Sequence, residues 1–255
     1  MRALNAQMNS DKIVNVISAA GMGKLPDRNA AEAVQRIPGV SIERDQGEGR
    51  FVAVRGLPSQ WSSSSINGDR LPTAEEETTS RATAFDFFPT EMIELVEVSK
   101  AVTADMEGDA MGGNVNFITR TAPDERVLNV TLGTSFHEKS GESGYTSNFL
   151  FGDITEDGKF GYIINGTAWV RDWATDNIEQ RRGNDGLGIR RLELRDYTGK
   201  RETYGLNGAA EFNPTDTDKF YVRTLYGTLE DDELHYKHRN RFDKNRVEVQ
   251  NIHDI

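Results

Sequence analysis

The chain has 255 residues, of which 36% are hydrophobic and 28% charged, so it is long enough for one large domain or two ordinary ones with a packed core. Its formal net charge is −11, because 41 acidic side chains outnumber 30 basic ones, and this balance argues against a nucleic-acid partner. Cysteine is absent, which excludes disulfide scaffolds, thiolate metal sites and a cysteine nucleophile.

No stretch approaches the roughly 20 consecutive apolar residues of a membrane-spanning helix. A transmembrane β-barrel stays possible, because its strands alternate apolar and polar residues. The first ten residues lack the charged start, apolar run and cleavage site of a signal peptide. We therefore expect either a truncated mature protein or an incomplete reading frame.

The N-terminal half begins with mixed α and β signals. Residues 13–17 form an apolar strand candidate, and Asp27 or Asn29 can cap a helix over residues 30–37, whose apolar side chains share one face. Pro38 and Gly39 then end this helix.

Alternating segments follow this helix. Residues 40–44 and 51–55 predict a hairpin around a polar tip, and Asn67-Gly68 predicts a second, tight hairpin turn. Pro89 opens a short helical turn, and the last strands are expected over 95–98 and 115–119. Up to about Ala122, the sequence therefore predicts a small α+β domain.

From Arg126 onward, about six segments place apolar side chains at every second position. Val130, Leu132 and Phe136 alternate with small or polar residues, and the same pattern recurs in two further sets: Phe160, Tyr162, Ile164; and Tyr204, Leu206, Ala210, Phe212. This period is typical of barrel strands, although a soluble antiparallel sheet has the same period.

The predicted connections alternate in character. Residues 153–158 and 213–218 are expected to be tight turns, whereas 172–200 and 230–245 are expected to be long, charged loops. The fold class predicted from the residues is thus an α+β domain followed by an antiparallel all-β segment, which is either the opening part of a transmembrane β-barrel or a soluble sheet.

Five motifs occur in one order along the N-terminal half. They are NAAEAVQRIPGVSIER at 29–44, FVAVRGL at 51–57, INGDR at 66–70, IELVEVSK at 93–100 and GGNVNFITR at 112–120. The ordered set resembles the plug domain of TonB-dependent outer-membrane receptors. The segments 45–50 and 57–61 are similar to a subgroup in Gram-negative bacteria that takes up carbohydrates and other scarce nutrients.

The resemblance implies a plug domain over 1–122 and the N-terminal part of a truncated outer-membrane β-barrel over 123–255. It implies uptake of a nutrient such as a carbohydrate or siderophore, with the plug gating the barrel. The implied partners are the small-molecule nutrient, the TonB energising complex and outer-membrane lipid. The TonB box has no visible counterpart before Asp11, and an open sheet of about six strands is not expected to insert stably by itself.

The resemblance also implies that ligand meets the plug at outward tips. The implied ligand-binding residues are Asp45, Gln46, Gln60, Trp61, Arg70 and Glu75. Trp61 is the strongest candidate, because an exposed ring can stack on a sugar or an aromatic chelator, but it could equally pack under its loop. The run Glu75-Glu76-Glu77 fits a solvated acidic loop better than a cation site.

Other residues are expected to shape the plug or join it to the barrel. Arg55 and Arg120 are candidates for plug–barrel ion pairs, or else are solvated strand ends. The predicted structural turn residues, where a positive φ or a close backbone approach is required, are Gly39, Gly56, Asn67, Gly68, Gly112 and Gly113.

No catalytic residue, cofactor or metal site is predicted. His235 and His238 lack a carboxylate at zinc-hydrolase spacing, and the glycine-rich run 108–113 lacks the Gly-Lys-Ser/Thr of a phosphate loop. Two alternatives remain: a soluble plug-like binding module without transport activity, and a carbohydrate-active enzyme. The dyad pattern after Arg126 favours the receptor over both.

Overall fold

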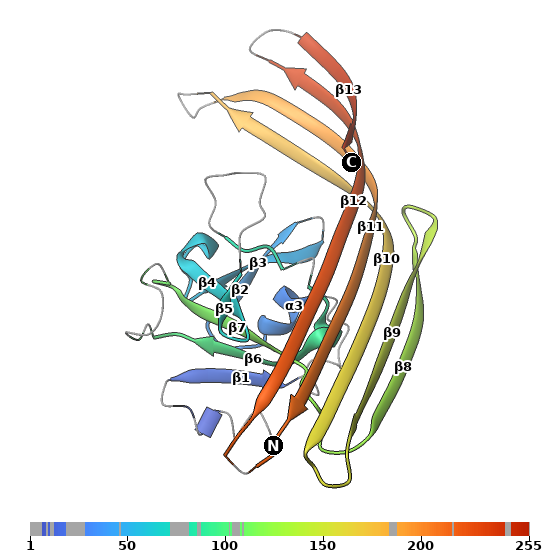
Figure 1. Cartoon of the computed structure of the whole chain (residues 1–255). Coiled ribbons are helices and arrows are strands. Elements are labelled where there is room, and N and C mark those ends of the chain that lie inside the picture. The colour runs from blue at the N-terminus through green and yellow to red at the C-terminus, as the bar shows by residue number, and fades with distance from the viewer. Residues whose placement is uncertain are drawn as a thin grey trace. The chain divides into compact units, whose positions relative to one another are not determined.

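The computed structural model describes residues 7–8, 10, 13–18, 29–45, 47–71, 82–85, 88–101, 103, 108, 110–183, 188–215, 217–242 and 246–254. Within them an N-terminal α+β part precedes six long strands, all labelled in Figure 1. None of the described helices has the length and apolarity needed to cross a bilayer.

The N-terminal part is built on a five-stranded sheet with the order β1-β6-β7-β4-β5. Its strands are β1 (Val14–Ser18), β4 (Ser62–Ile66), β5 (Asp69–Arg70), β6 (Ile93–Ser99) and β7 (Gly113–Thr119). The central pair, β6 and β7, is antiparallel, whereas β4 runs parallel to β7 with Ser62 opposite Gly113. The strands predicted over 13–17, 95–98 and 115–119 are therefore present.

A separate hairpin pairs β2 (Val40–Asp45) with β3 (Glu48–Val54), as predicted. The predicted helix is present as α3 (Ala30–Val34), shorter than expected. Asn29 is its N-cap, since the Asn29 side chain accepts a hydrogen bond from the Glu32 amide at 3.1 Å. Asp27, the other predicted cap, lies outside the described residues.

The core of this part lies between α3, the β2–β3 hairpin and one face of the five-stranded sheet. Phe117 is its centre, with ring centroids 4.9 Å from Phe85 and 5.7 Å from Phe88. Alternation on β7 directs Val115 and Phe117 into this core and Asn114 and Asn116 to the opposite face. The buried apolar set is Ala30, Ala31, Ala33, Val34, Ile37, Val40, Val52, Val54, Phe85, Phe88, Met92, Ile93, Val96, Val98, Val115 and Phe117.

Two short 3₁₀ turns complete the part: η1 (Ser59–Trp61) and η2 (Thr90–Met92). Pro89 precedes η2, as the sequence predicts. Asn67 and Gly68 join β4 to β5 with φ of 53° and 92°, values that suit the tight hairpin turn expected of an Asn-Gly pair.

The other predicted turn residues divide into two kinds. Gly39, Gly56 and Gly113 have φ of 76°, 71° and 137°, in the region that favours glycine. Gly112 is instead a position of close approach, where a Cβ would lie 2.7 Å from the Ser62 hydroxyl.

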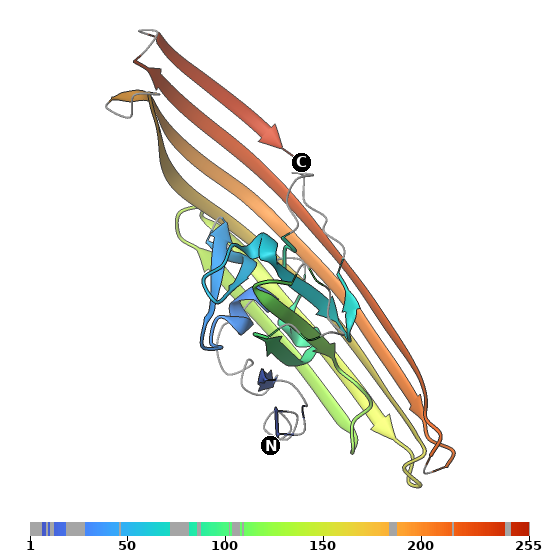
Figure 2. The ribbon, with the colours of Figure 1, turned by 90° about the vertical axis from the view of Figure 1, so that its left-hand side faces the viewer.

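The C-terminal half is a six-stranded sheet ordered β13-β12-β11-β10-β9-β8, so each strand neighbours the next in sequence. Figures 1 and 2 both show these strands side by side. Their bounds are β8 Val127–His137, β9 Glu142–Ile154, β10 Phe160–Arg182, β11 Ile189–Phe212, β12 Phe220–Arg241 and β13 Arg246–Asp254.

The long loops predicted over 172–200 and 230–245 are wrong. Strand β10 continues to Arg182, β11 starts at Ile189 and β12 continues to Arg241. Charged residues do not end these strands because they meet opposite charges across the sheet, as Arg201 does with Asp231. We call residues 172–182, 189–200 and 230–241 the strand extension.

The six strands have one apolar and one polar face. The apolar face carries Leu132, Ile164 and Leu206, which are 77%, 47% and 51% exposed, and its aromatic pairs include Phe151 with Tyr162. The polar face carries Asn165, whose side-chain amide donates to the Asn148 side chain at 2.8 Å. This alternation matches the predicted dyad period.

By its internal contacts the chain divides into two compact units. One comprises 1–130, 148–167 and 205–227, and the other comprises 131–147, 168–204 and 228–255. The predicted domain boundary after Ala122 falls between β7 and β8, and that division stays a prediction.

Candidate functional site

The predicted ligand residues of the N-terminal part lie at two different ends of its sheet. Trp61 immediately precedes β4, and its carbonyl accepts a hydrogen bond from the Gly112 amide at 2.7 Å. Arg70 follows the turn at the far end of β4, where the Asn67 amide donates to the Phe117 carbonyl at 2.8 Å. A five-residue strand is about 16 Å long, so the sheet does not bring Trp61 and Arg70 together.

The β2–β3 tip belongs to the Arg70 end. Asp45 pairs with Glu48 at this tip, and the adjacent Gly49 carbonyl accepts from the Asn29 side chain at 2.8 Å. Asn29 in turn bridges to Pro89, just before β6 begins. Asp45 and Arg70 are therefore on one side of the domain, and Gln60 and Trp61 on the other.

Gln46 and Glu75 lie outside the described residues. Gln60 is exposed, and Trp61 is 40% exposed in η1, where its amide donates to the Pro58 carbonyl at 2.9 Å. A half-covered indole of this kind can both pack locally and offer a stacking face. The ligand roles of these residues stay predictions.

Arg55 and Arg120 make their described hydrogen bonds inside the N-terminal part. Arg55, itself at a φ of 59°, donates to the Gly112 carbonyl at 3.0 Å and to the Met111 carbonyl. Arg120 donates to the Glu91 carbonyl at 2.7 Å. Both side chains thus fix loops beside the sheet, and their predicted contact with a barrel wall stays a prediction.

Burial perturbs the acid–base chemistry beside Arg120. Burial raises the pKa of Glu91, although hydrogen bonds and the positive charge of Arg120 oppose the shift. Burial likewise lowers the pKa of Arg120, and the charges of Glu94 and Glu91 oppose that shift. Ionisation of Glu91 therefore lowers the stability of the folded protein.

A second polar site lies on the strand extension, around the fully buried Glu193 of β11. Glu193 is 1% exposed and accepts hydrogen bonds from the Nε of Arg195 at 2.9 Å and from the Nε of Arg239 of β12 at 2.6 Å. It also forms an ion pair with Arg191 at 2.9 Å. Arg195 also donates to Glu179 of β10 at 2.7 Å. We call these five residues the Glu193 cluster.

Burial alone would raise the pKa of Glu193, but hydrogen bonds from Arg195 and Arg239 lower it to about 2. Burial lowers the pKa of the neighbouring Lys237; the positive charges of Arg195 and Arg239 act in the same direction, and the carboxylates of Glu193 and Glu179 oppose the shift. The arginines of the cluster thus favour the ionised form of Glu193.

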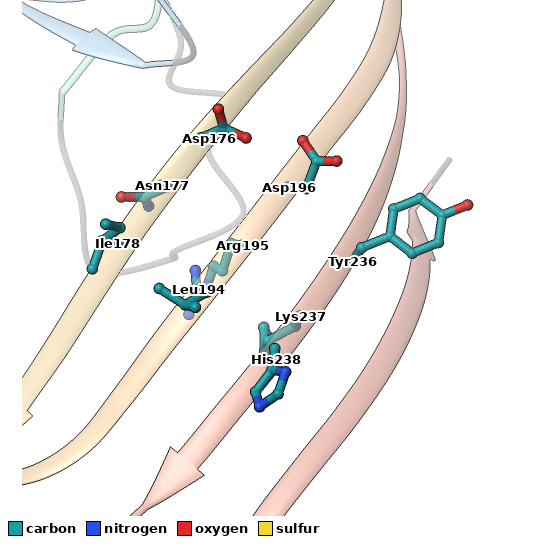
Figure 3. A pocket seen from close by; sticks show the side chains of 9 residues that line it. All are labelled: Asp176, Asn177, Ile178, Leu194, Arg195, Asp196, Tyr236, Lys237 and His238. Atoms are coloured by element: carbon teal, nitrogen blue, oxygen red, sulfur yellow. The ribbon is translucent and has the colours of Figure 1, made fainter.

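The strand extension also has a pocket of about 580 Å³, lined by residues of both faces. Figure 3 shows that its lining residues come from three neighbouring strands, with Tyr236, Lys237 and His238 following one another on β12. Lys139 binds Asp176 and Asp196 on two neighbouring strands at its rim. The pocket is lined by Asp176, Asn177, Ile178, Leu194, Arg195, Asp196, Tyr236, Lys237 and His238.

Sequence reasoning missed the Glu193 cluster, although a signal for it was present. Arg191, Glu193 and Arg195 occupy alternate positions, as do Lys237 and Arg239. Charged residues at both alternating positions favour a loop over a strand in a hydropathy pattern, so this period alone does not reveal the strand. No group of acidic, histidine or cysteine side chains suited to a metal ion occurs within the described ranges.

Together, the small α+β domain and the following sheet of long strands with one exposed apolar face form the architecture that the sequence resemblance implies. Comparison with known proteins agrees. Residues 6–114 match the model of the TonB-dependent receptor plug domain. This part of the chain is therefore a plug domain of the TonB-dependent receptor type, and the relatives that the chain matches are a transporter and an outer-membrane protein.

Two curated relatives illustrate the similarity. The chain is 32% identical over 122 residues to the vitamin B12 transporter BtuB of Photobacterium profundum, covering 47% of this chain and 20% of the transporter. It is 25% identical over 185 residues to the iron-regulated outer membrane virulence protein of Vibrio cholerae, covering 70% of this chain and 28% of that protein. The chain thus spans about a fifth to a quarter of these relatives.

Solved structures share the fold. The ferric enterobactin receptor PfeA of Pseudomonas aeruginosa superposes with a TM-score of 0.54 at 15% identity, covering 98% of this chain and 45% of that one. The unliganded ferric citrate transporter FecA gives 0.53 at 15% identity, with 98% and 52% covered. At this identity the likeness concerns the fold alone.

Proposed function

We propose that this chain is the gating and first membrane-facing part of a receptor that takes up a scarce nutrient across the outer membrane. The observation that carries the proposal is the joining of a plug domain to strands with a continuous exposed apolar face. A soluble binding module has no use for such a face, since water-exposed apolar patches of that extent promote aggregation. The face suits lipid.

In this proposal the small-molecule nutrient binds at the tips of the plug, and the TonB complex supplies the energy that moves the plug. The nutrient class is a siderophore, a carbohydrate or a similarly scarce compound. Vitamin B12 and iron appear in the names of the relatives, which supports uptake of some nutrient without fixing which one.

The test is deletion of the gene in its host, followed by uptake of labelled ferric siderophores, vitamin B12 and oligosaccharides. We expect uptake of one nutrient to fall to the level of a strain without TonB, and the intact gene to restore it. A gene that lacks only the codons for residues 29–119 should not restore energised uptake, because the plug is then missing. Unchanged uptake of every nutrient, or uptake independent of TonB, would contradict the proposal.

A further inference from the structure

We propose that strand β7 shields the Asn67–Gly68 turn of the plug domain from deamidation, with Asn116 as the residue that holds the reactive Gly68 nitrogen. An Asn-Gly pair is prone to this reaction, because asparagine is chemically labile and glycine has no side chain to hinder its own nitrogen. Nothing in the family match or in the names of the relatives concerns this turn. The inference concerns the chemical durability of the plug and does not depend on which nutrient is taken up.

The reaction needs only water and a solvent base. The Gly68 amide nitrogen loses its proton to the base and attacks Cγ of the Asn67 side chain, which forms the new N–Cγ bond of a succinimide ring. The Cγ–Nδ2 bond then breaks, and Nδ2 takes up a proton from solvent and leaves as ammonia. Water adds to either ring carbonyl and opens the ring to aspartate or isoaspartate, without any oxidation or reduction.

The position of the turn leaves it open to solvent. Asn67 and Gly68 form the two-residue connection between β4 and β5, with Ile66 opposite Asp69. Gly68 is exposed and Asn67 is half-buried, and a Cβ built on Gly68 would meet nothing within 4 Å. The described residues therefore give this side of the glycine no steric cover, and its protection has to come from hydrogen bonds.

Hydrogen bonds to β7 hold each group that the reaction uses. The Gly68 amide, which is the nucleophile, donates to the Asn116 Oδ1 at 3.0 Å. The Asn67 Nδ2, which is the leaving group, donates to the Thr119 Oγ1 at 3.0 Å, and the Asn67 Oδ1 accepts from the Thr119 amide at 3.0 Å. The nucleophile and the side chain that it would attack are thus directed at different residues of β7.

This arrangement slows the reaction in two ways. An N–H that already donates to a fixed oxygen is less available to a solvent base. The Asn67 side chain cannot rotate toward the Gly68 nitrogen without breaking both of its bonds to Thr119. The Thr119 amide polarises the Asn67 carbonyl, but polarisation does not promote attack on a group that is held away from the nucleophile.

Asn116 is itself fixed from both sides of β7. Its Oδ1 also accepts from the Ser65 hydroxyl of β4 at 3.0 Å, and its Nδ2 donates to the Glu97 carboxylate of β6 at 3.1 Å. A side chain bonded to both neighbouring strands stays aimed at the turn with little loss of freedom. Asn116 is therefore a positioning residue for the Gly68 nitrogen.

Deamidation would damage the turn that β7 holds. An aspartate at position 67 has no Nδ2 to donate to Thr119, and it adds a negative charge close to Asp69. An isoaspartate also inserts a methylene group into the backbone, so that Ile66 and Asp69 no longer meet in register across the turn. The shielding therefore preserves the end of the plug sheet where β4, β5 and β7 meet.

The chain contains internal references for the test. Asn165–Gly166 and Asn207–Gly208 are the same dipeptide, within β10 and β11. The full chain is incubated at mildly alkaline pH, either folded in a non-ionic detergent or unfolded in concentrated urea, and deamidation at each site is followed by peptide mass spectrometry. In urea we expect the turn and both references to react at similar rates. In the folded chain we expect Asn67 to react at least about tenfold more slowly than in urea.

Variants separate the role of Asn116 from a general effect of the polar face. Asn116→Ala removes the acceptor of the Gly68 amide and should speed deamidation of Asn67 in the folded chain about tenfold, since one net hydrogen bond is worth roughly this factor. The matched control is Asn114→Ala, which removes the same residue type from the same face of β7. Asn114 bonds to Ser63 and Ser65 but not to the turn, so this control should leave the rate at Asn67 unchanged.

Thr119→Val provides a second variant of nearly unchanged shape. It removes only the acceptor of the Asn67 Nδ2 and should speed deamidation by a smaller factor than Asn116→Ala. Circular dichroism of each variant recognises a folding defect, and Thr119→Val decides the test if Asn116→Ala misfolds. The inference is overturned if Asn67 reacts as fast in the folded chain as in urea, if the alanine variants at 116 and 114 give equal rates, or if neither Asn116→Ala nor Thr119→Val speeds the reaction.

Discussion

Replacing Gly113 by alanine is expected to destabilise the plug domain far more than the same change at Gly68. Both glycines have positive φ, 137° and 92°, so both substitutions strain the backbone by about 1–2 kcal/mol. The two positions differ in the room for a side chain. A Cβ at Gly68 would meet nothing within 4 Å, whereas a Cβ at Gly113 would lie 2.5 Å from the Ser99 carbonyl oxygen and 3.1 Å from Val54.

The Ser99 oxygen cannot retreat easily, because Ser99 pairs with Asn114 in the β6–β7 ladder at the centre of the sheet. Overpacking of this kind adds about 1–3 kcal/mol, so Gly113→Ala should cost about 2–5 kcal/mol in total and Gly68→Ala about 1–2 kcal/mol. With a urea m-value of about 1–3 kcal/mol/M, the two midpoints should differ by about 1 M.

The measurement is urea unfolding of a protein that ends at Pro123, in which Trp61 is the single tryptophan and its carbonyl binds the Gly112 amide. Trp61 fluorescence therefore reports on the strand junction next to the substitution. Equal midpoints for the two variants would refute the reasoning, since they would mean that β6 and β7 can move apart at Gly113 without loss of stability.

Three further expectations follow from the same contacts. Because burial raises the pKa of Glu91, its ionisation destabilises the folded state, and stability present at low pH is lost as the pH rises above 4.5. In thermal melts of the full chain in detergent, Glu91→Gln should therefore unfold at a higher temperature than the unaltered chain at pH 7, and at the same temperature near pH 4. Asn29→Ala should lower the free energy of unfolding by about 1–2 kcal/mol, through loss of the α3 cap and of the bond to Gly49, and an unchanged urea midpoint would contradict the cap assignment. Because the apolar face is exposed, the full chain should sediment as aggregates without detergent while the protein ending at Pro123 sediments as a monomer; a full chain that runs as a clean monomer would remove the argument for a lipid-facing surface.

Local signals in the sequence were sufficient for the small elements of the plug. Asn29 could be recognised as a cap, Asn67-Gly68 as a hairpin turn and Pro89 as the start of a helical turn, because each depends on a few neighbouring residues. The order of the strands could not be read in this way. The parallel pairing of β4 with β7 joins residues about 50 positions apart, and no local signal in the sequence specifies it.

The strand extension was missed for a different reason. A search for alternating apolar and polar residues recognises strands with one apolar face, as in Val130 to Phe136, but charged residues interrupt both faces of the extension. There the alternation separates residues such as Glu193, which is buried among arginines, from residues such as Asp196, which is exposed. The charge of a residue does not tell whether the residue is buried or exposed, because its ion-pair partner lies on a neighbouring strand.

The net charge of the whole chain and the charges around one residue have different consequences for a ligand. A net charge of −11 argues against a partner as long and as uniformly charged as nucleic acid, which would sample much of the surface. It does not argue against a small anion, because salt screens charges beyond about 8–10 Å and a small ligand responds mainly to the groups within that distance. At Lys237 those groups are of both signs: Arg195 and Arg239 oppose its positive charge, whereas Glu193 and Glu179 favour it. The net charge of the chain therefore bears on long, uniformly charged partners, and the arrangement of nearby groups decides whether a small ion binds.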